Sequence, residues 1–468
     1  MRVFLVACVL CTVSLAHADT ELPLVDLDNK GVELTKEPPP FRRSYTLAGV
    51  EVTSIVLLLN LGGRTVGAEY SEVSPHTMWR NLKEGFVIDQ DAFTINQLGH
   101  PMEGIAMFTA SRSAGLSFWA SEAFAFAGSL TYEALMENEP PSVGDQIMTP
   151  FVGAMLGEPL HRFATAMLYT GYGQPNTFRR VAASVVDPLG AFNRAIYGDA
   201  WYKEVPPAMY AYVGVGATQQ VGSFGATSES AAAHLEVVAE HGLTGDSSFE
   251  PEHPMDHFDL RMSLDVKNKD FDGSIYSRGL LWGRGFRSPH GTTRGLAGLF
   301  AAYDFNNQER VRHSIAAFGP GITTEIALGS NGGYLQGTIA GYLVPWGAAG
   351  GVGEIAGEGF RDYHRGPGLA ALAEAKIGKR RFGEVRVASR LYEIAGRLAN
   401  DDADELVSTT SAGARLQLTS HQAIGVEGAF TIRKASYGTD FPMPITGDDR
   451  VTQATIFYAL TTDQITHK

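Results

Sequence analysis

The chain has 468 residues, 53 of them glycine, and 19% of its residues are charged. Average proteins contain about 7% glycine and about 25% charged residues, so this composition points to turns and apolar surfaces and excludes a long disordered protein. The net charge of −14 excludes a general electrostatic attraction to nucleic acid. At roughly 100–200 residues per domain, the length allows two to four domains or one large barrel with an appendage.

The N-terminus has the pattern of a secretory signal peptide. A basic residue, Arg2, precedes an apolar run over residues 3–15, and the small-residue motif Ala16-His17-Ala18 follows. This pattern predicts a signal peptide over residues 1–18, so the exported protein would begin at Asp19.

Both cysteines, Cys8 and Cys11, lie in the segment that export removes. The exported protein would therefore have no disulfide and no thiolate metal site. After the signal peptide we find no run of about 18 apolar residues, and the best candidate, Ile55–Leu59, is short enough to be a buried strand or helix turn. This excludes a helical inner-membrane protein and leaves the outer membrane, with the periplasm as the alternative.

Residues 19–45 are polar and proline-rich, which predicts an extended leader. Residues 46–200 are predicted to form a helical domain. Over residues 118–133 bulky and small side chains recur at three- and four-residue spacing, as in a closely packed helix. A second helix is predicted over residues 147–168, where Pro159 either kinks it or restarts it.

Residues 201–468 change to a period of two, which is typical of strands with one apolar face. At roughly 20 residues per strand and connection, this length predicts about 12 strands. The fold class is therefore α+β, an N-terminal helical domain followed by an antiparallel, outer-membrane-type β-barrel. A soluble periplasmic sandwich or barrel is the alternative, but charge on the second face of the strands favours a polar lumen. On one strand, the side chains expected to face lipid are Leu260, Met262 and Leu264, and those expected to face the lumen are Arg261, Asp265 and Lys267.

Polar motifs follow one another along residues 81–162. In chain order they are Asn81–Phe86, Asp89–Phe93 with Asn96-Gln97, His100-Pro101 with Gly104, Ala110–Gly115 with Phe118-Trp119, Gly128-Ser129 with Glu133, Glu137, Pro141-Ser142 with Asp145, and Gly157-Glu158 with His161-Arg162. In this order they resemble the bacterial domain-of-unknown-function family numbered 3943. The resemblance implies an exported protein of the Gram-negative envelope with helices followed by strands, and the family assigns no activity.

Titratable side chains in the helical domain are the candidates for chemistry. The catalytic candidates are His100, Glu133, Glu158 and His161, and the binding candidates are Arg112, Asp145 and Arg162. Because single charges in so apolar a segment would be costly, five of these are predicted to form one internal cluster. These five are Glu133, Asp145, Glu158, His161 and Arg162.

The spacing of Glu158 and His161 places both on one side of a helix, as in the Glu-x-x-His elements of carboxylate-bridged metal sites. A site of that kind needs two such elements, and the sequence has one; with Glu133 and His100 a mononuclear site could be built. In the alternative interpretation, Glu158 caps a helix that begins at Pro159, and Arg162 pairs with Asp145. We assign no metal and no cofactor from the sequence.

The sequence predicts an outer-membrane barrel whose helical domain lies at the periplasmic mouth or in the lumen, with a structural, transport or envelope-maintenance role. The alternative is an envelope enzyme that acts on a lipid or glycan through a His/Glu cluster, so the sequence leaves catalysis open. The expected partner is outer-membrane lipid, nucleic acid is not expected, and protein partners are not indicated.

Overall fold

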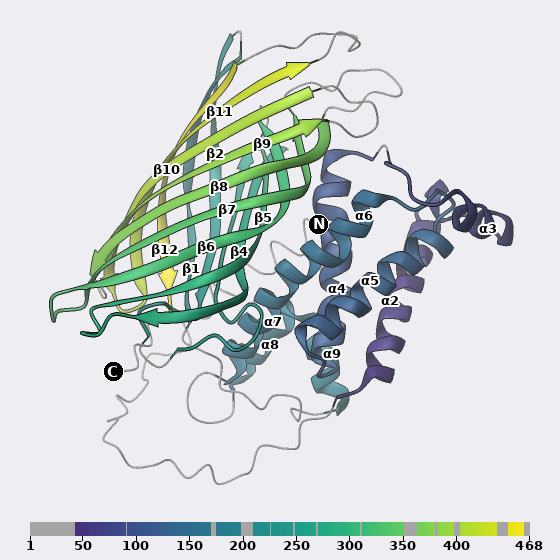
Figure 1. The fold of residues 1–468 in the computed structure, drawn as a ribbon, viewed down its shortest axis with the longest axis horizontal. Coiled ribbons are helices and arrows are strands. Elements are labelled where there is room, and N and C mark those ends of the chain that lie inside the picture. The colour runs from purple at the N-terminus through teal and green to yellow at the C-terminus, as the bar shows by residue number, and fades with distance from the viewer. Residues whose placement is uncertain are drawn as a thin grey trace.

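The structure is a computed structural model in which a helical domain precedes a closed β-barrel (Figure 1). It describes residues 43–468 except for residues 90, 170–174, 198–208, 225, 247–248, 268–269, 309–310, 351–362, 380–381, 397–402, 438–447 and 463–468. The predicted signal peptide and nearly all of the predicted leader lie outside the described residues.

The helical domain agrees with the predicted region. Its α-helices are α2 (Tyr45–Thr65), α3 (Pro75–Glu84), α4 (His100–Ser113), α5 (Phe118–Leu135), α6 (Val143–Ile147), α7 (Gly153–Tyr169), α8 (Thr177–Val186) and α9 (Pro188–Tyr197). The short helical turns are η1 (Glu69–Ser71), η2 (Ile95–Gly99) and η3 (Met148–Val152). Serine side chains cap α2, α3, α5 and α6 by accepting backbone N–H groups that the first turn leaves free. Pro159 lies inside α7.

The apolar segment Ile55–Leu59, expected to be a short buried strand or helix turn, is part of the 21-residue helix α2. Its length and mean hydropathy of 1.5 would allow it to cross a membrane. Glu51 and Asn60 interrupt the apolar run in the sequence, but both are buried, where Asn60 donates to the carbonyl oxygens of Ser71 and Met136. The opposite face of α2 exposes Leu57 and other apolar side chains.

The second domain is the predicted antiparallel barrel. Within the described residues, twelve strands pair each with the next, and β1 closes the barrel against β12. They are β1 (Met209–Phe224), β2 (Ala226–His241), β3 (Phe258–Lys267), β4 (Asp270–Arg287), β5 (Thr293–Asn307), β6 (Arg312–Leu328), β7 (Gly333–Gly350), β8 (Tyr363–Lys379), β9 (Gly383–Gly396), β10 (Ala403–Thr419), β11 (Gln422–Tyr437) and β12 (Asp448–Thr461).

The two faces of the strands differ as predicted. Arg261 and Asp265 of β3 face the lumen, where Arg261 binds Glu427 and Asp265 binds His234. The outer face carries an apolar belt over β6–β12, in which Ile339 and Ile456 are 67% and 63% exposed. Further exposed members of this belt are Ile322, Leu343, Leu369, Ile377, Val387, Leu391, Leu416, Val426 and Phe430.

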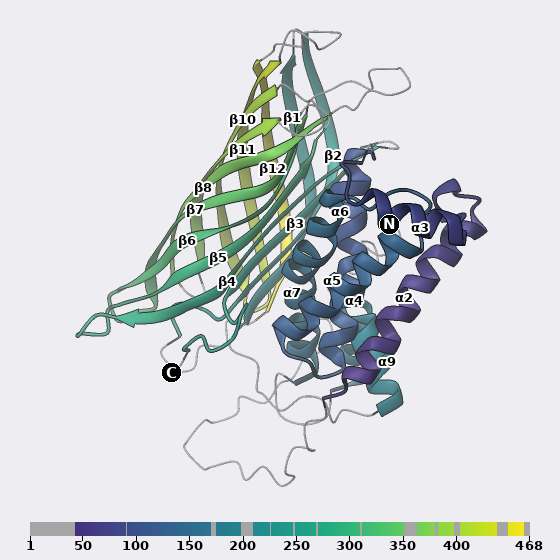
Figure 2. The ribbon, with the colours of Figure 1, turned by 45° about the vertical axis from the view of Figure 1, so that its right-hand side comes forward.

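The helical domain lies against the outside of the barrel wall, along β3–β8 (Figures 1 and 2). Ser277, in the middle of β4, donates a hydrogen bond of 3.1 Å to the carbonyl oxygen of Met155 in α7. Trp119 of α5 stacks on Trp282 of β4 with ring centroids 4.9 Å apart. The predicted position at the mouth or in the lumen is therefore wrong.

This position also corrects the expected surroundings of β3. Leu260 and Met262 point outward, but they pack against the helical domain rather than facing lipid. Leu264 is partly exposed. An apolar strand face has the same sequence pattern whether helices or lipid cover it, so the alternation could not distinguish the two.

Candidate functional site in the helical domain

Three candidate residues meet where α4, α5 and α6 come together. His100 begins α4, Glu133 lies in the last turn of α5, and Asp145 lies in the first turn of α6. Each offers one nitrogen or oxygen atom, and these three atoms lie within 4.8 Å of one another. The exposed fractions of His100, Glu133 and Asp145 are 6%, 2% and 4%, so this His100 centre is buried.

Ser142 holds the two carboxylates of the His100 centre in place. Its hydroxyl oxygen accepts the backbone N–H groups of Gly144 and Asp145, which caps α6. Its own backbone N–H donates to Glu133 Oε2 at 3.1 Å. One residue therefore fixes the start of the helix that carries Asp145 and orients Glu133 beside it.

Several polar atoms of the His100 centre have no hydrogen-bond partner within the described residues. They are both ring nitrogens of His100 and Oδ1 of Asp145. His100 Nε2 lies 3.3 Å from Asp145 Oδ1, and His100 Nδ1 lies 3.6 Å from Glu103 Oε2. Buried polar groups in native proteins are nearly always hydrogen-bonded, so these atoms point to a ligand-binding role.

Acidic side chains surround His100. Besides Glu133 and Asp145, the carboxyl groups of Glu103 and Glu137 lie close enough to interact with its ring electrostatically. Glu137 follows α5, and burial raises the pKa of its carboxyl to about 8 although His100 acts in the opposite direction.

Asp89 connects this region to the barrel. The Asp89 carboxylate accepts hydrogen bonds from Ser142 Oγ at 2.5 Å and Asn96 Nδ2 at 2.6 Å, and Oδ1 lies 3.0 Å from Arg365 Nη1 of β8. Burial alone would raise the pKa of Asp89, but Arg365 and the two hydrogen bonds lower it to about 2. The fully buried Arg365 guanidinium lies over the Trp346 ring at 5.7 Å.

A second cluster lies further along α7. Glu158 is fully buried and accepts from Arg112 Nε at 2.6 Å and from Arg162 Nε at 2.8 Å. Arg162 Nη1 also lies 2.9 Å from Oδ1 of Asp256, which belongs to the connection between β2 and β3. In this Glu158 cluster the carboxylate oxygens are satisfied by guanidinium groups, so its geometry is that of a structural ion-pair network.

His161 lies beside the Glu158 cluster and joins α7 to α9. Its Nδ1 lies 2.9 Å from Asp187 Oδ2, and Asp187 Oδ1 accepts the backbone N–H of Gly190 in the first turn of α9. His161 therefore has a partner that orients its ring, and it does not join His100.

The predicted single cluster is thus two clusters. Asp145 and Glu158 lie 13 residues apart on one uninterrupted helical run, α6–η3–α7, and a rise of 1.5 Å per residue separates them by roughly 20 Å. The predicted pairing of Arg162 with Asp145 is wrong for the same reason. Glu158 lies inside α7 and does not cap a helix at Pro159.

Four residues that shape the His100 centre or its link to the barrel were not among the candidates predicted from the sequence. They are Asp89, Glu103, Ser142 and Arg365. Asp89 and Ser142 stand among the motifs that carry the family resemblance, so a signal for them was present. Arg365 follows Asp89 by 276 residues, and no local pattern marks it.

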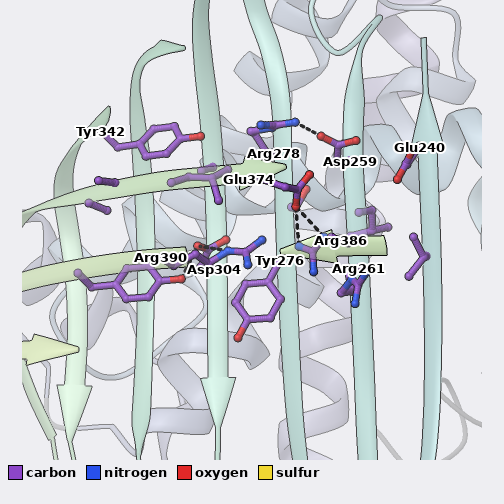
Figure 3. A pocket seen from close by; sticks show the side chains of 18 of the residues that line it. Glu240, Asp259, Arg261, Tyr276, Arg278, Asp304, Tyr342, Glu374, Arg386 and Arg390 are labelled. Carbon is purple, nitrogen blue, oxygen red and sulfur yellow. Dashed lines mark hydrogen bonds and ion pairs between the residues drawn. The ribbon is translucent and has the colours of Figure 1, made fainter. Parts of the chain in front are cut away.

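The barrel interior is a second region rich in charge, and it was predicted to be polar. Figure 3 shows arginine and carboxylate side chains from several strands pointing toward one another inside the barrel. Arg278 pairs with Asp259, and Arg386 Nη2 lies 2.6 Å from Glu374 Oε2. Between such pairs the lumen keeps cavities of about 50 and 70 Å³.

The sequence comparison with protein families reaches the helical domain. Residues 85–189 match the family Domain of unknown function (DUF3943). The DUF3943 segment contains the three residues of the His100 centre and also Glu158 and His161. The comparison with curated proteins gives no match.

The similar solved structures include porins and monoaromatic hydrocarbon channels, and also the outer-membrane protease OmpT from Escherichia coli. The alignment with the NanC porin covers 52% of this chain and 98% of the porin, with 8% sequence identity and a TM-score of 0.27. The alignment with the anion-selective porin from Comamonas acidovorans covers 54% of this chain and 99% of the porin, with 9% sequence identity and a TM-score of 0.22. The alignment with the toluene transporter TodX from Pseudomonas putida covers 55% of this chain and 90% of the transporter, with 8% sequence identity and a TM-score of 0.23.

Proposed function

We propose that this protein is an outer-membrane protein with a structural or envelope-maintenance role, in which the barrel anchors and supports the helical domain and does not serve as a diffusion channel. The observation that carries this proposal is the network of paired charged side chains inside the barrel. Arg278 pairs with Asp259, and Arg386 pairs with Glu374. Side chains held in such pairs occupy the path that a diffusing solute would take.

The side chains that fill the lumen also connect distant strands. Arg261 of β3 reaches Glu427 of β11 at 2.5 Å, and Tyr392 of β9 donates to Asp304 of β5 at 2.7 Å. These contacts cross the interior rather than following neighbouring strands. They would hold the barrel closed and stiff, as a support requires.

The outer surface supports a place in the bilayer. The apolar belt over β6–β12 leaves large hydrophobic side chains exposed, which water disfavours and hydrocarbon accepts. The helices contact the middle of β4 at Ser277, so in a membrane-spanning barrel they lie at bilayer depth beside the wall. The exposed apolar face of α2 is consistent with this position. Outer-membrane lipid is therefore the expected partner of both domains.

Two measurements test this function. The protein should fractionate with the outer membrane, and its recovery in the soluble periplasmic fraction would contradict the location. In planar lipid bilayers the purified chain should give no stepwise conductance, whereas Arg386→Ala combined with Arg390→Ala should introduce conductance by clearing the lumen. Stepwise conductance of the unaltered chain would favour transport.

The second candidate function is an envelope enzyme that acts on a lipid or glycan. It is favoured by the unpartnered atoms of His100 and Asp145 in a domain that we place against lipid. An Asp145→Asn variant that folds and is exported normally, but fails to restore the detergent resistance of a deletion strain, would support it. Full restoration would leave the anchoring function as the better account.

A further inference from the structure

We propose that the His100 centre binds one divalent transition-metal ion of the zinc type, with His100, Glu133 and Asp145 as its protein ligands. This inference concerns the helical domain and does not depend on whether the lumen conducts solutes.

The spacing of the ligand atoms fits such an ion. Zinc bonds to imidazole nitrogen and carboxylate oxygen are about 2.0–2.2 Å long, so two ligands of a tetrahedral ion lie about 3.4 Å apart. His100 Nε2 and Asp145 Oδ1 are 3.3 Å apart. Glu133 completes the set, since one ligand atom from each of the three residues lies within 4.8 Å of the other two. An ion placed among the three atoms would need only small movements of the side chains.

The unsatisfied atoms at this place form the second argument. His100 Nε2 and Asp145 Oδ1 face each other, yet neither has a hydrogen-bond partner within the described residues. Both side chains are more than nine-tenths buried, so bulk water does not solvate them. A bound cation would satisfy both atoms at once and would also neutralise buried carboxylates.

The surroundings of His100 resemble those of a metal-bound imidazole. In metal sites the ring nitrogen that does not bind the ion faces a carboxylate or carbonyl group that orients the ring. Here His100 Nδ1 lies 3.6 Å from Glu103 Oε2. Ser142 supports the other two ligands, because it caps the helix of Asp145 and donates to Glu133.

The ligand set favours zinc-type ions over calcium and magnesium. Calcium takes six to eight oxygen ligands, and magnesium demands octahedral oxygen coordination with several waters. One imidazole with two carboxylates is typical of zinc and related ions, and three protein ligands leave a fourth position for water or a substrate oxygen.

The Glu158 cluster provides the contrast within the same domain. Arg112 and Arg162 bind the Glu158 carboxylate, and Asp187 binds His161 Nδ1. The Glu-x-x-His spacing that suggested metal chemistry in the sequence therefore serves ion pairs, while the metal-type geometry appears in residues from three different helices.

The test uses the full chain, purified in detergent and stripped of metal with a chelator. Titration with Zn²⁺ alone should give one ion per chain by calorimetry, and Co²⁺ should give the visible absorption of a tetrahedral site. Asp145→Asn and Glu133→Gln should each weaken Zn²⁺ binding at least tenfold. Glu122→Gln is the matched control, because Glu122 lies on the same helix as Glu133, 11 residues earlier, and should leave binding unchanged.

The isosteric variants keep the test falsifiable if His100→Ala does not fold. Folding is checked by the mobility of the unheated barrel in electrophoresis and by circular dichroism. A folded unaltered chain that binds no Zn²⁺ overturns the proposal, and so does a Glu122→Gln variant that loses as much affinity as Glu133→Gln. Retained binding by a folded Asp145→Asn variant would remove Asp145 from the site.

Discussion

The barrel lumen and the His100 centre both bury charge, but they treat it differently. In the lumen, buried cations and carboxylates lie in contact, as in the link of Arg433 to Glu405 at 2.6 Å and to Asp449 at 2.8 Å. At the His100 centre, carboxyl groups gather around a single imidazole whose nitrogens have no hydrogen-bond partner in the described part of the chain. The contrast teaches that arginine side chains match the buried carboxylates of the lumen, whereas several acidic side chains at the His100 centre share one imidazole, so this centre is where a further cation is expected.

Truncation of Glu158 is expected to have the largest effect, because its buried carboxylate pairs with two arginine side chains. Glu158→Ala would leave Arg112 and Arg162 buried without their shared carboxylate, so we expect a loss of roughly 3–5 kcal/mol in the free energy of unfolding. Urea unfolding of the chain in lipid vesicles measures it. The control is Glu250→Ala, which breaks an exposed ion pair with Arg287 and should cost less than about 1 kcal/mol. Equal losses would contradict the distinction.

A charge introduced into the apolar belt of the barrel wall is expected to have the next largest effect. Ile456 lies near the middle of β12 and is exposed, so Ile456→Arg should cost roughly 2–4 kcal/mol in vesicles if it meets the bilayer midplane. Leu418, near the end of β10, is the depth control, and Leu418→Arg should cost about 0–1 kcal/mol. If the two variants lose the same free energy, the belt does not lie across the bilayer.

Zn²⁺ binding would give the acidic side chains of the His100 centre a cationic partner and would stabilise the folded protein. At a Zn²⁺ concentration 100 times the Kd, a site that exists only in the folded state stabilises it by about 2.7 kcal/mol. We expect Zn²⁺ to stabilise the unaltered chain by about this amount and the Asp145→Asn variant much less. A Zn²⁺-induced stabilisation of equal size in both would assign the metal to another place.

The Asp89–Arg365 contact adds a pH dependence, the smallest effect of the four. The pKa of Asp89 is lowered to about 2 in the folded protein, against about 3.9 for an unperturbed Asp. Its contribution is therefore fully present above about pH 4 and is lost as the pH falls toward 2, by at most about 2 kcal/mol. The unaltered chain should lose more stability between pH 5 and pH 2.5 than Asp89→Asn does. Parallel curves would exclude this contact as the cause.

The architecture was predictable because alternation of side chains along strands is a local property. The alternation of β3 between Leu260 and Arg261 is enough to separate an outer face from a lumen. The His100 centre was predictable only in part. His100, Glu133 and Asp145 were all selected, but the sequence grouped Asp145 with Glu158, because it does not show that helices α6, η3 and α7 join into one run.

The remaining features depend on contacts between distant parts of the chain. Arg365 meets Asp89 only after the barrel has closed and the helices have docked on it. The sequence also did not show which strands the helices cover. Apolar side chains such as Leu260 and Met262 are expected on the outer face whether helices or lipid lie against it.

The docking of the helices on the outer wall constrains how the protein can be assembled. The helical domain precedes in the chain the strands β3–β8 that form its docking surface, so it is synthesised first. In the outer-membrane location that we propose, it would have to remain competent for docking until those strands are in place, and then enter the bilayer together with them. The Trp119–Trp282 stack forms only at that step, so the change in its fluorescence would time the arrival of the helices against the closure of the barrel.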